Sequence, residues 1–157
     1  MADETRDDES ALLSAVHELF TERIPFNKLL GIRIDSMSFE SARIRFDFRG
    51  ELVGNIMRGS LHGGVVSAVL DLTGGLVAFL HAATKAGGGS DREKLETLAN
   101  VGTIDMRVDY LRPGTGRYFL ASAYLLRSGN KVAVTRMELH NDEDSLIAVG
   151  TAAYLVG

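Results

Sequence analysis

The longest apolar stretch of the chain spans residues 61–83, and Asp71 is the one charged side chain that interrupts it. Apolar side chains recur within it at helical spacing, at Val65, Val69, Leu72, Leu76, Phe79 and Leu80. This period predicts one long helix from Gly63 to about Thr84, roughly 33 Å in length at about 1.5 Å per residue. Because a carboxylate in an apolar helix is costly unless it is paired, hydrated or neutralised, Asp71 is either satisfied at an interface or placed there for chemistry.

Two stretches before this helix alternate between apolar and polar residues. Residues 31–37 and 42–48 do so with a period of two, which predicts the strands of a hairpin that turns near residues 39–41. On the second strand, Arg43, Arg45, Asp47 and Arg49 point to the face opposite the apolar residues. We expect this face to be solvated, and a role in binding substrate phosphate is the alternative. The segment from Gly50 to Ser60 has no such period and is expected to be a loop.

The N-terminal region predicts a further helix. Its apolar residues fall on one helical face, at Leu12, Leu13, Val16, Leu19 and Phe20. We expect this helix to run from Ala11 to about Arg23, with Ser10 as its N-cap. Residues 1–8 are acidic and polar, and we expect them to be mobile.

Four more alternating stretches follow the central helix, at residues 103–111, 118–127, 131–140 and 146–156. In the first of them, Ile104, Met106, Val108 and Tyr110 share one face. Ahead of these strands, Ser90 and Glu93 have the spacing of a helix capping box, which predicts a short helix ending near Ala99. The pattern as a whole indicates an α+β protein with a mostly antiparallel sheet.

Composition narrows the class of protein. The 157 residues are 45% hydrophobic and 24% charged, which suits one soluble domain with its own core. There is no Cys, so the chain has neither a disulfide nor a thiolate nucleophile. The net charge of -4 argues against a nucleic-acid partner. The acidic N-terminus is unlike a signal peptide, and glycines and Asp71 make residues 61–83 a poor membrane span, so we expect a cytoplasmic protein.

Two kinds of site find no support in the sequence. His17, His81 and His140 have no metal-ligand spacing, so a metal site is not expected. Residues 58–63 do not fit the GxSxG pattern of a serine hydrolase, which argues against a Ser-His-Asp mechanism.

Several motifs together carry a family resemblance. They are His62-Gly63-Gly64 with Asp71 nine residues after the His, the segment from Gly102 to Gly114, Asn130 to Val134, and Glu138 to Asn141. In this order they resemble the PaaI-like branch of the hotdog-fold acyl-CoA thioesterases, and the last two are similar to its YigI-type subgroup. The resemblance implies an α+β hotdog fold, with an antiparallel sheet wrapped around one long central helix. The implied division is an N-terminal acidic tail and helix over residues 1–24 and a single hotdog thioesterase domain over residues 25–157.

The resemblance also implies the catalytic residues. Gly63 would supply a helix N-terminal amide as the oxyanion donor, and Asp71 would act as base or nucleophile. Thr103 would orient the water, and Asn55 would be a second group that polarises the thioester carbonyl, although it lies seven residues before His62 where the family pattern has six. Structural roles stay open as well: a tight turn or close packing for Gly63, a cap or an ion pair for Asp71, and an ordinary strand position for Thr103. His62 could orient the loop or hydrogen-bond near the carbonyl, or it could serve only as a helix cap.

The expected substrate is a medium- to long-chain acyl-CoA, with no cofactor beyond the coenzyme A thioester itself and no metal. The candidate substrate-binding residues are Gly64 at the helix start and four basic residues in or beside turns, Arg58, Arg112, Arg127 and Lys131. Phe79, Met106 and Leu111 are candidates for an acyl tunnel or, equally, for the core.

The resemblance implies a homodimer, and the pairing of two such dimers into a dimer of dimers. Gly63 and Asn55 of one chain would then face Asp71 and Thr103 of the other. Two alternatives stay open at this point: a non-catalytic acyl-CoA-binding hotdog module, and an acyl-thioester hydratase or dehydratase.

Overall fold

The computed structural model describes residues 2–85, 90, 93 and 96–157. Its helices are α1 (Ala2–Glu18), a π-helical turn (Leu19–Arg23), α2 (Pro25–Leu30), a 3-10 turn (Gly50–Leu52), α3 (Gly63–Lys85) and a second 3-10 turn (Thr97–Asn100). Its strands are β1 (Arg33–Met37), β2 (Ser41–Asp47), β3 (Val53–Asn55), β4 (Ser60–Leu61), β5 (Gly102–Tyr110), β6 (Tyr118–Ser128), β7 (Val132–Asn141) and β8 (Leu146–Leu155).

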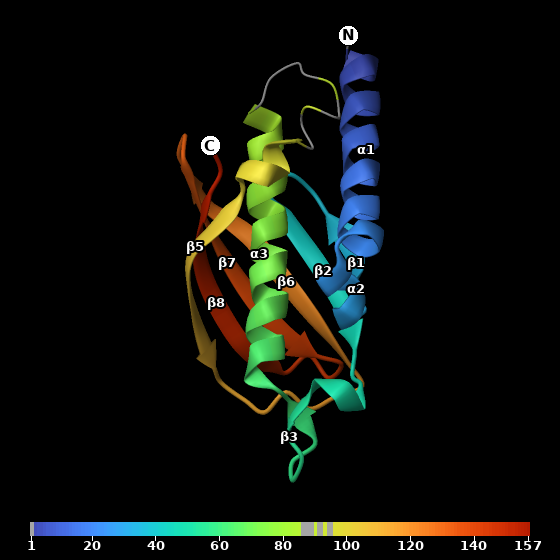
Figure 1. Cartoon of the computed structure of the whole chain (residues 1–157), viewed down its shortest axis with the longest axis vertical. Coiled ribbons are helices and arrows are strands. Elements are labelled where there is room, and N and C mark those ends of the chain that lie inside the picture. Colours follow the sequence, from blue (N-terminus) through green and yellow to red (C-terminus); the bar gives the residue numbers. More distant parts are fainter. Residues whose placement is uncertain (1, 86–89, 91–92, 94–95) are drawn as a thin grey trace.

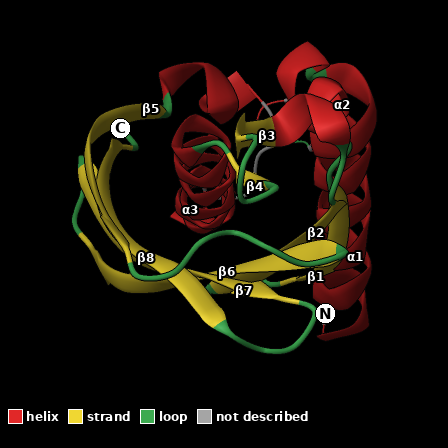
Figure 2. Cartoon of the chain, turned by 90° about the horizontal axis from the view of Figure 1, so that it is seen from below, coloured by secondary structure: helices red, strands yellow, loops and turns green. Residues whose placement is uncertain are grey.

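Six of the strands form one antiparallel sheet in the order β1-β2-β6-β7-β8-β5. The sheet curves around α3, which lies in its concave face (Figures 1 and 2). The expected α+β hotdog architecture is confirmed. The two edges of the sheet are β1 and β5, and β3 pairs with β4 in a separate small hairpin near the start of α3.

Helix α3 is the core element that its sequence period predicts. It is long and apolar enough to cross a membrane, but more than half of its apolar window is buried inside the protein. Its side chains at Val69, Leu70, Leu76, Val77, Phe79 and Leu80 are fully buried. Phe79 stacks on Phe20 with ring centroids 6.4 Å apart, so the N-terminal helical segment shares the core of the sheet and α3. Core packing thus accounts for Phe79.

Three predictions about local structure need correction. The first helix begins at Ala2 rather than at Ala11, so residues 2–8 are helical. Ser10 therefore lies inside α1 rather than at its N-cap. Acidic residues are favoured in the first turns of a helix, which is consistent with this early start. The segment from Gly50 to Ser60 also contains more than a loop, because it holds a 3-10 turn and most of the β3–β4 hairpin.

The predicted capping box is present. The Ser90 amide donates to Glu93 Oε2 at 2.7 Å, and the Glu93 amide donates to Ser90 Oγ at 3.4 Å. Much of the short helix predicted to end near Ala99 lies outside the described residues, and the described part ends in the 3-10 turn Thr97–Asn100.

Strand β5 has a bulge that changes which of its side chains face α3. Thr103 pairs with Tyr154 and Asp105 pairs with Ala153, so Ile104 is an extra residue. Uninterrupted alternation would place Thr103 on the face opposite Met106. The bulge moves Thr103 onto the Met106 face, and Ile104 is 55% exposed rather than part of the inner face. The predicted face is therefore wrong for Ile104.

Candidate active site

The start of α3 is organised by the side chain that precedes it. His62 Nδ1 accepts a 2.8 Å hydrogen bond from the Gly64 amide, and the His62 carbonyl accepts from Val65 at 2.9 Å and from Val66 at 3.3 Å. Among the described residues, none accepts a hydrogen bond from the Gly63 amide. A helix N-terminus combines such unpaired N–H groups with the positive end of the helix dipole. The first turn of α3 therefore presents one free donor, the Gly63 N–H.

Two neighbouring elements fix this turn in place. The Tyr110 hydroxyl donates to the Gly63 carbonyl at 3.0 Å, which ties the end of β5 to the start of α3. On the other side, a Cβ on Gly54 would lie 2.5 Å from the Cα of His62, so the β3–β4 hairpin packs directly against the residue before the helix. Gly54 has to be glycine for this close approach.

A pocket of about 350 Å³ opens at this helix start. Its lining comes from the β3–β4 hairpin, α3, the end of β5 with the segment after it, and the start of β8. It includes Asn55, Arg58, Gly63, Tyr110, Leu111, Arg112 and Ile147. The Asn55 Oδ1 atom accepts a hydrogen bond from the Arg58 amide at 3.1 Å, so the amide end of Asn55 keeps its two donors. The structure thus brings four of the predicted residues together: Asn55, Arg58, Gly63 and Arg112.

Asp71 lies further along α3 and is held by two hydroxyl groups. The Thr103 hydroxyl donates to Oδ1 of Asp71 at 2.9 Å. The Tyr154 hydroxyl donates to the Asp71 main-chain carbonyl at 2.9 Å and to the same Oδ1 at 3.2 Å. Among the described residues, no donor reaches Oδ2. The predicted pair of Asp71 and Thr103 is therefore in contact within one chain.

Within one chain, the Asp71 carboxylate and the Gly63 amide lie far apart. Asp71 comes eight residues after Gly63, which is about 12 Å of helix rise. The hydrogen-bonded partners of Asp71, Thr103 and Tyr154, lie at the start of β5 and the end of β8. The Gly63 pocket is lined from the opposite ends of these two strands, by Tyr110 and Ile147, and by the β3–β4 hairpin. One chain therefore carries a free backbone donor, the Gly63 N–H, and a hydrogen-bonded carboxylate, Asp71, at separate places on the same helix.

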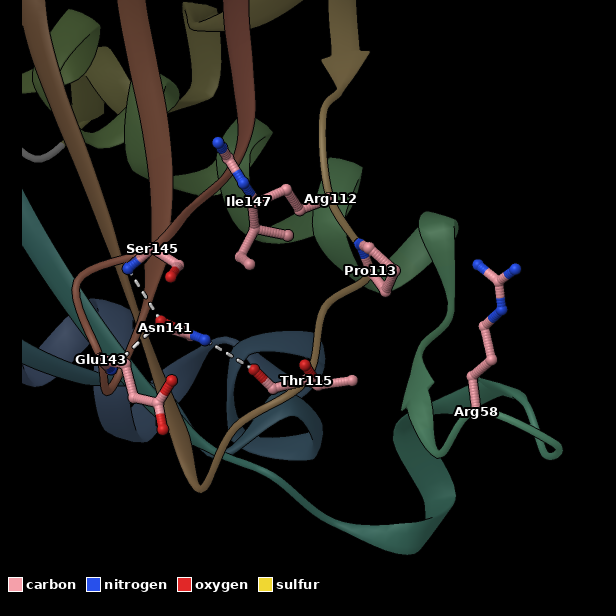
Figure 3. Close-up of a pocket in the computed structure, with 8 residues that line it drawn as sticks. All are labelled: Arg58, Arg112, Pro113, Thr115, Asn141, Glu143, Ser145 and Ile147. Carbon is pink, nitrogen blue, oxygen red and sulfur yellow. Dashed lines mark hydrogen bonds between the residues drawn. The ribbon is translucent and has the colours of Figure 1, made fainter.

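The four predicted basic residues divide between the two ends of the molecule. Arg58 and Arg112 line both the Gly63 pocket and an adjoining one of about 470 Å³, where they lie on either side of Pro113 (Figure 3). Arg127 and Lys131 are exposed beside the β6–β7 turn. That turn contacts the opposite end of α3, because Lys85 Nζ donates to Ser128 Oγ at 3.1 Å and to the Gly129 carbonyl at 3.0 Å.

Hydrogen bonds of the Asn141 side chain hold one side of the adjoining pocket in place. Asn141 is 7% exposed, and its amide nitrogen donates to the Thr115 carbonyl at 2.9 Å. Its Oδ1 accepts from the amides of Glu143 and Ser145 at 3.1 and 2.9 Å. Figure 3 shows these contacts between the β7–β8 turn and the segment that follows Pro113. Asn141 therefore fixes the wall that the β7–β8 turn contributes to this pocket.

An apolar pocket of about 370 Å³ lies on the other side of the same helix start. It is formed by α2, the 3-10 turn Gly50–Leu52 with the residue before it, and the first turns of α3. Most of its lining is apolar, while Arg49, Glu51 and His62 are its polar members; the rest are Phe26, Leu29, Leu30, Leu52, Gly64, Val65 and Ala68. Phe26 is 51% exposed and Leu29 67% exposed, so these two side chains leave apolar surface open at this pocket. Of the three acyl-tunnel candidates, Leu111 lines the Gly63 pocket, and Met106 packs against the core.

Two tyrosines at the site were not anticipated from the sequence. Tyr110 contacts Gly63, and Tyr154 contacts Asp71. Alternation marks Tyr110 only as an inward-facing strand residue, and Tyr154 is 83 positions from its partner, so no local pattern signals either contact. In the part of the chain that the structure describes, no group of three His, Asp or Glu side chains could hold a metal ion.

Comparisons with known proteins identify the family of this chain. A family model described as "Thioesterase superfamily" matches residues 58–148. The Escherichia coli K12 protein named medium/long-chain acyl-CoA thioesterase YigI is 46% identical over 145 residues, covering 92% of this chain and 94% of that protein.

Two solved structures extend the comparison. A Shewanella oneidensis protein related to the thioesterase superfamily has a TM-score of 0.88 and 42% identity, covering 95% of this chain and 97% of its own. The Escherichia coli PaaI protein of the phenylacetic acid degradation operon shares the fold, with a TM-score of 0.76 at 19% identity and 96% coverage of both chains.

Proposed function

The chain belongs to the thioesterase superfamily, and from that premise we propose that it hydrolyses medium- to long-chain acyl-CoA thioesters to a free acid and coenzyme A. The observation that carries the proposal is the free Gly63 amide at the start of α3, between a pocket lined by two arginines and an apolar pocket. An acyl-CoA has the matching order of parts: an anionic nucleotide, a thioester and an apolar chain. The proposed enzyme is a cytoplasmic homo-oligomer.

Thioester hydrolysis needs a donor for the charge that develops on the carbonyl oxygen. In the proposed reaction the Gly63 N–H and the Asn55 amide supply it. The arginine-lined pocket takes the phosphates of coenzyme A, because Arg58 and Arg112 both face it and guanidinium groups bind phosphate well. The apolar pocket beside α2 takes the acyl chain, in keeping with a cavity of this size and lining.

The carboxylate of Asp71 acts on the carbonyl carbon, either through water or directly. As a base, it accepts a proton from water while the water oxygen bonds to the carbon, and the C–S bond then breaks as the proton passes to the leaving thiolate. As a nucleophile, it forms a mixed anhydride with release of the thiolate, and water cleaves the anhydride in a second step. Both routes leave the carboxylate regenerated.

We propose further that the two halves of the site come from different subunits. Gly63 and Asn55 would face Asp71 of the partner subunit. The separation of about 12 Å along one helix supports this arrangement. So does the sheet edge at β5, where Ile104 and Tyr110 are each 55% exposed, because an exposed apolar edge strand invites pairing with a second copy.

Release of free thiol from a panel of acyl-CoA substrates of increasing chain length tests the function. We expect turnover that rises from short to medium and long chains. The panel should include 2-enoyl and 3-hydroxyacyl thioesters. Addition or loss of water without thiol release would identify a hydratase or dehydratase, and saturable binding without any reaction would identify an acyl-CoA-binding module; either result ends the proposal.

A further inference from the structure

The hydroxyl of Tyr154 is buried beside the Asp71 side chain, and the reaction outlined above does not use it. Tyr154 is 1% exposed and lies on β8, the last strand in the chain. Its hydroxyl donates to the main-chain carbonyl of Asp71 at 2.9 Å and to Oδ1 at 3.2 Å. A single phenolic proton thus serves the backbone and the carboxylate of the same residue, which fixes the side chain relative to its own helix.

The sheet register explains why two hydroxyls meet at one carboxylate oxygen. Thr103 and Tyr154 are direct partners in the β5–β8 pair, so their side chains stand on the same face of the sheet. Both donate to Oδ1 of Asp71. The bulge at Ile104 is what brings Thr103 onto this face.

The helix makes room for the phenol. A Cβ added to Gly74 would lie 2.5 Å from the Tyr154 hydroxyl and 2.7 Å from Thr135 Oγ1. Since real Cβ atoms do not approach so closely, any larger residue at Gly74 would displace the hydroxyl. The glycine one turn after Asp71 is therefore matched to the tyrosine that holds Asp71.

The phenol remains a donor across the working pH range. Burial, and then the charge and hydrogen bond of Asp71, raise the pKa of Tyr154 far above its usual range. The hydroxyl therefore keeps its proton at neutral pH. An oxygen that already accepts two hydrogen bonds is a weaker base and nucleophile than one that accepts none.

We propose that Tyr154 is a positioning residue which, with Thr103, occupies Oδ1 of Asp71 and leaves Oδ2 as the oxygen that acts on the thioester or its water. This inference rests on the proposed function, because it assigns a supporting role at the same carboxylate. It adds a residue whose own atoms do not touch the substrate.

The test compares Tyr154→Phe with Tyr124→Phe, which removes the same hydroxyl from a side chain that is 48% exposed. We expect kcat for acyl-CoA hydrolysis to fall about 10- to 100-fold in Tyr154→Phe, with KM within about twofold of the wild type, because a hydrogen bond to a charged group is lost but no substrate contact is. The acid limb of the pH–rate profile should move to higher pH, since the charged carboxylate loses a donor. Tyr124→Phe should match the wild type in all three respects.

Two further variants keep the test decisive if Tyr154→Phe does not fold. Gly74→Ala should reproduce its kinetics by pushing the hydroxyl away. Replacing Tyr154 with 3,5-difluorotyrosine keeps the shape and strengthens the donor, so the acid limb should move to lower pH. The inference is overturned if folded variants keep kcat and the pH profile, or if KM rises as much as kcat falls. A wild-type protein that hydrolyses no acyl-CoA would instead end the proposed function, and this inference with it.

Discussion

The Gly64 amide donates a 2.8 Å hydrogen bond to Nδ1 of His62, so the side chain that precedes α3 also caps it. We expect His62→Ala to lower the free energy of unfolding by about 1 kcal/mol, because the first turn loses its side-chain acceptor. His62→Asn restores an acceptor and should recover most of that loss. Urea unfolding of the two variants measures the difference. If His62→Asn is as stable as the wild type but inactive, His62 contacts the substrate as well.

Asp71→Asn should lower kcat by about 10²- to 10⁴-fold, because an amide can neither accept the proton of water nor attack the carbonyl. Binding of acyl-CoA and folding should change little, since the amide oxygen can still accept from Thr103 and Tyr154. Steady-state kinetics and calorimetric binding give the two readouts. Asp35→Asn, at an exposed carboxylate on β1, is the matched control and should behave as the wild type. Retention of more than about a tenth of the activity would make Asp71 structural.

Gly63→Pro should abolish hydrolysis because it removes the amide proposed to hold the oxyanion, while proline is well tolerated at the first position of a helix. Gly63→Ala is its matched control. The added Cβ would meet the Tyr110 ring at 3.5 Å, an ordinary contact, and the N–H is retained. We therefore expect the alanine variant to keep substantial activity, as measured by thiol release. Similar losses in both variants would assign the effect to packing rather than to the amide.

Mixing Gly63→Pro with Asp71→Asn tests whether the site is shared. If each site takes Gly63 from one subunit and Asp71 from the other, subunit exchange creates one competent site per mixed dimer. Random pairing of equal amounts should then restore up to about a quarter of wild-type activity. Exchange can be followed with tagged chains in the same samples. Two folded, exchanging variants that stay inactive together would show that the site lies within one chain.

Alanine substitutions at Arg58, Arg127 and Lys131 should reveal which end of α3 holds the nucleotide of coenzyme A. We expect Arg58→Ala to raise KM by about 3- to 10-fold with little change in kcat, because phosphate contacts far from the carbonyl bind ground and transition states alike. An acyl-pantetheine substrate, which lacks the nucleotide, should not distinguish Arg58→Ala from the wild type. A raised KM only in Arg127→Ala or Lys131→Ala would place the nucleotide at the far end instead.

Ala68→Leu should shift the preferred acyl chain towards shorter lengths, because the larger side chain fills part of the apolar pocket beside α2. We expect kcat/KM for long chains to fall by about tenfold, and for short chains by less than about twofold. Ala11→Leu adds the same atoms at an exposed position of α1 and serves as the control. An unchanged chain-length profile would exclude this pocket from acyl binding.

The sequence predicts best those helices and strands that are long enough to repeat a helical or alternating pattern of apolar residues several times. The helix from Gly63 and the six strands of the main sheet fall within one or two residues of their predicted ends. The β3–β4 hairpin was missed because its strands of three and two residues are too short to show alternation. The early start of α1 was missed because residues 2–8 carry no apolar face.

The site was harder to predict than the fold because its contacts depend on register and distance in sequence. Asn55, Gly63 and Arg112 line one pocket, because the β3–β4 hairpin, the start of α3 and the segment after β5 lie side by side. Thr103 reaches Asp71 only through the bulge at Ile104, and simple alternation places it on the wrong face. Tyr154 reaches Asp71 from a strand 83 residues away, which no local pattern can signal.

The strand order also dictates when Asp71 can be held during folding. Strand β5 joins the rest of the sheet only through β8, so both hydroxyl partners of the carboxylate depend on β8 being in place. The β5–β8 pairing joins residues far apart in the chain, so we expect it to form late, because closing a long loop costs entropy before the contacts compensate for it. A partly folded chain that lacks β8 can bury much of α3 against β2, β6 and β7 while Asp71 remains unsupported. We therefore expect the Asp71 carboxylate to gain its two hydroxyl partners only when β5 and β8 pair.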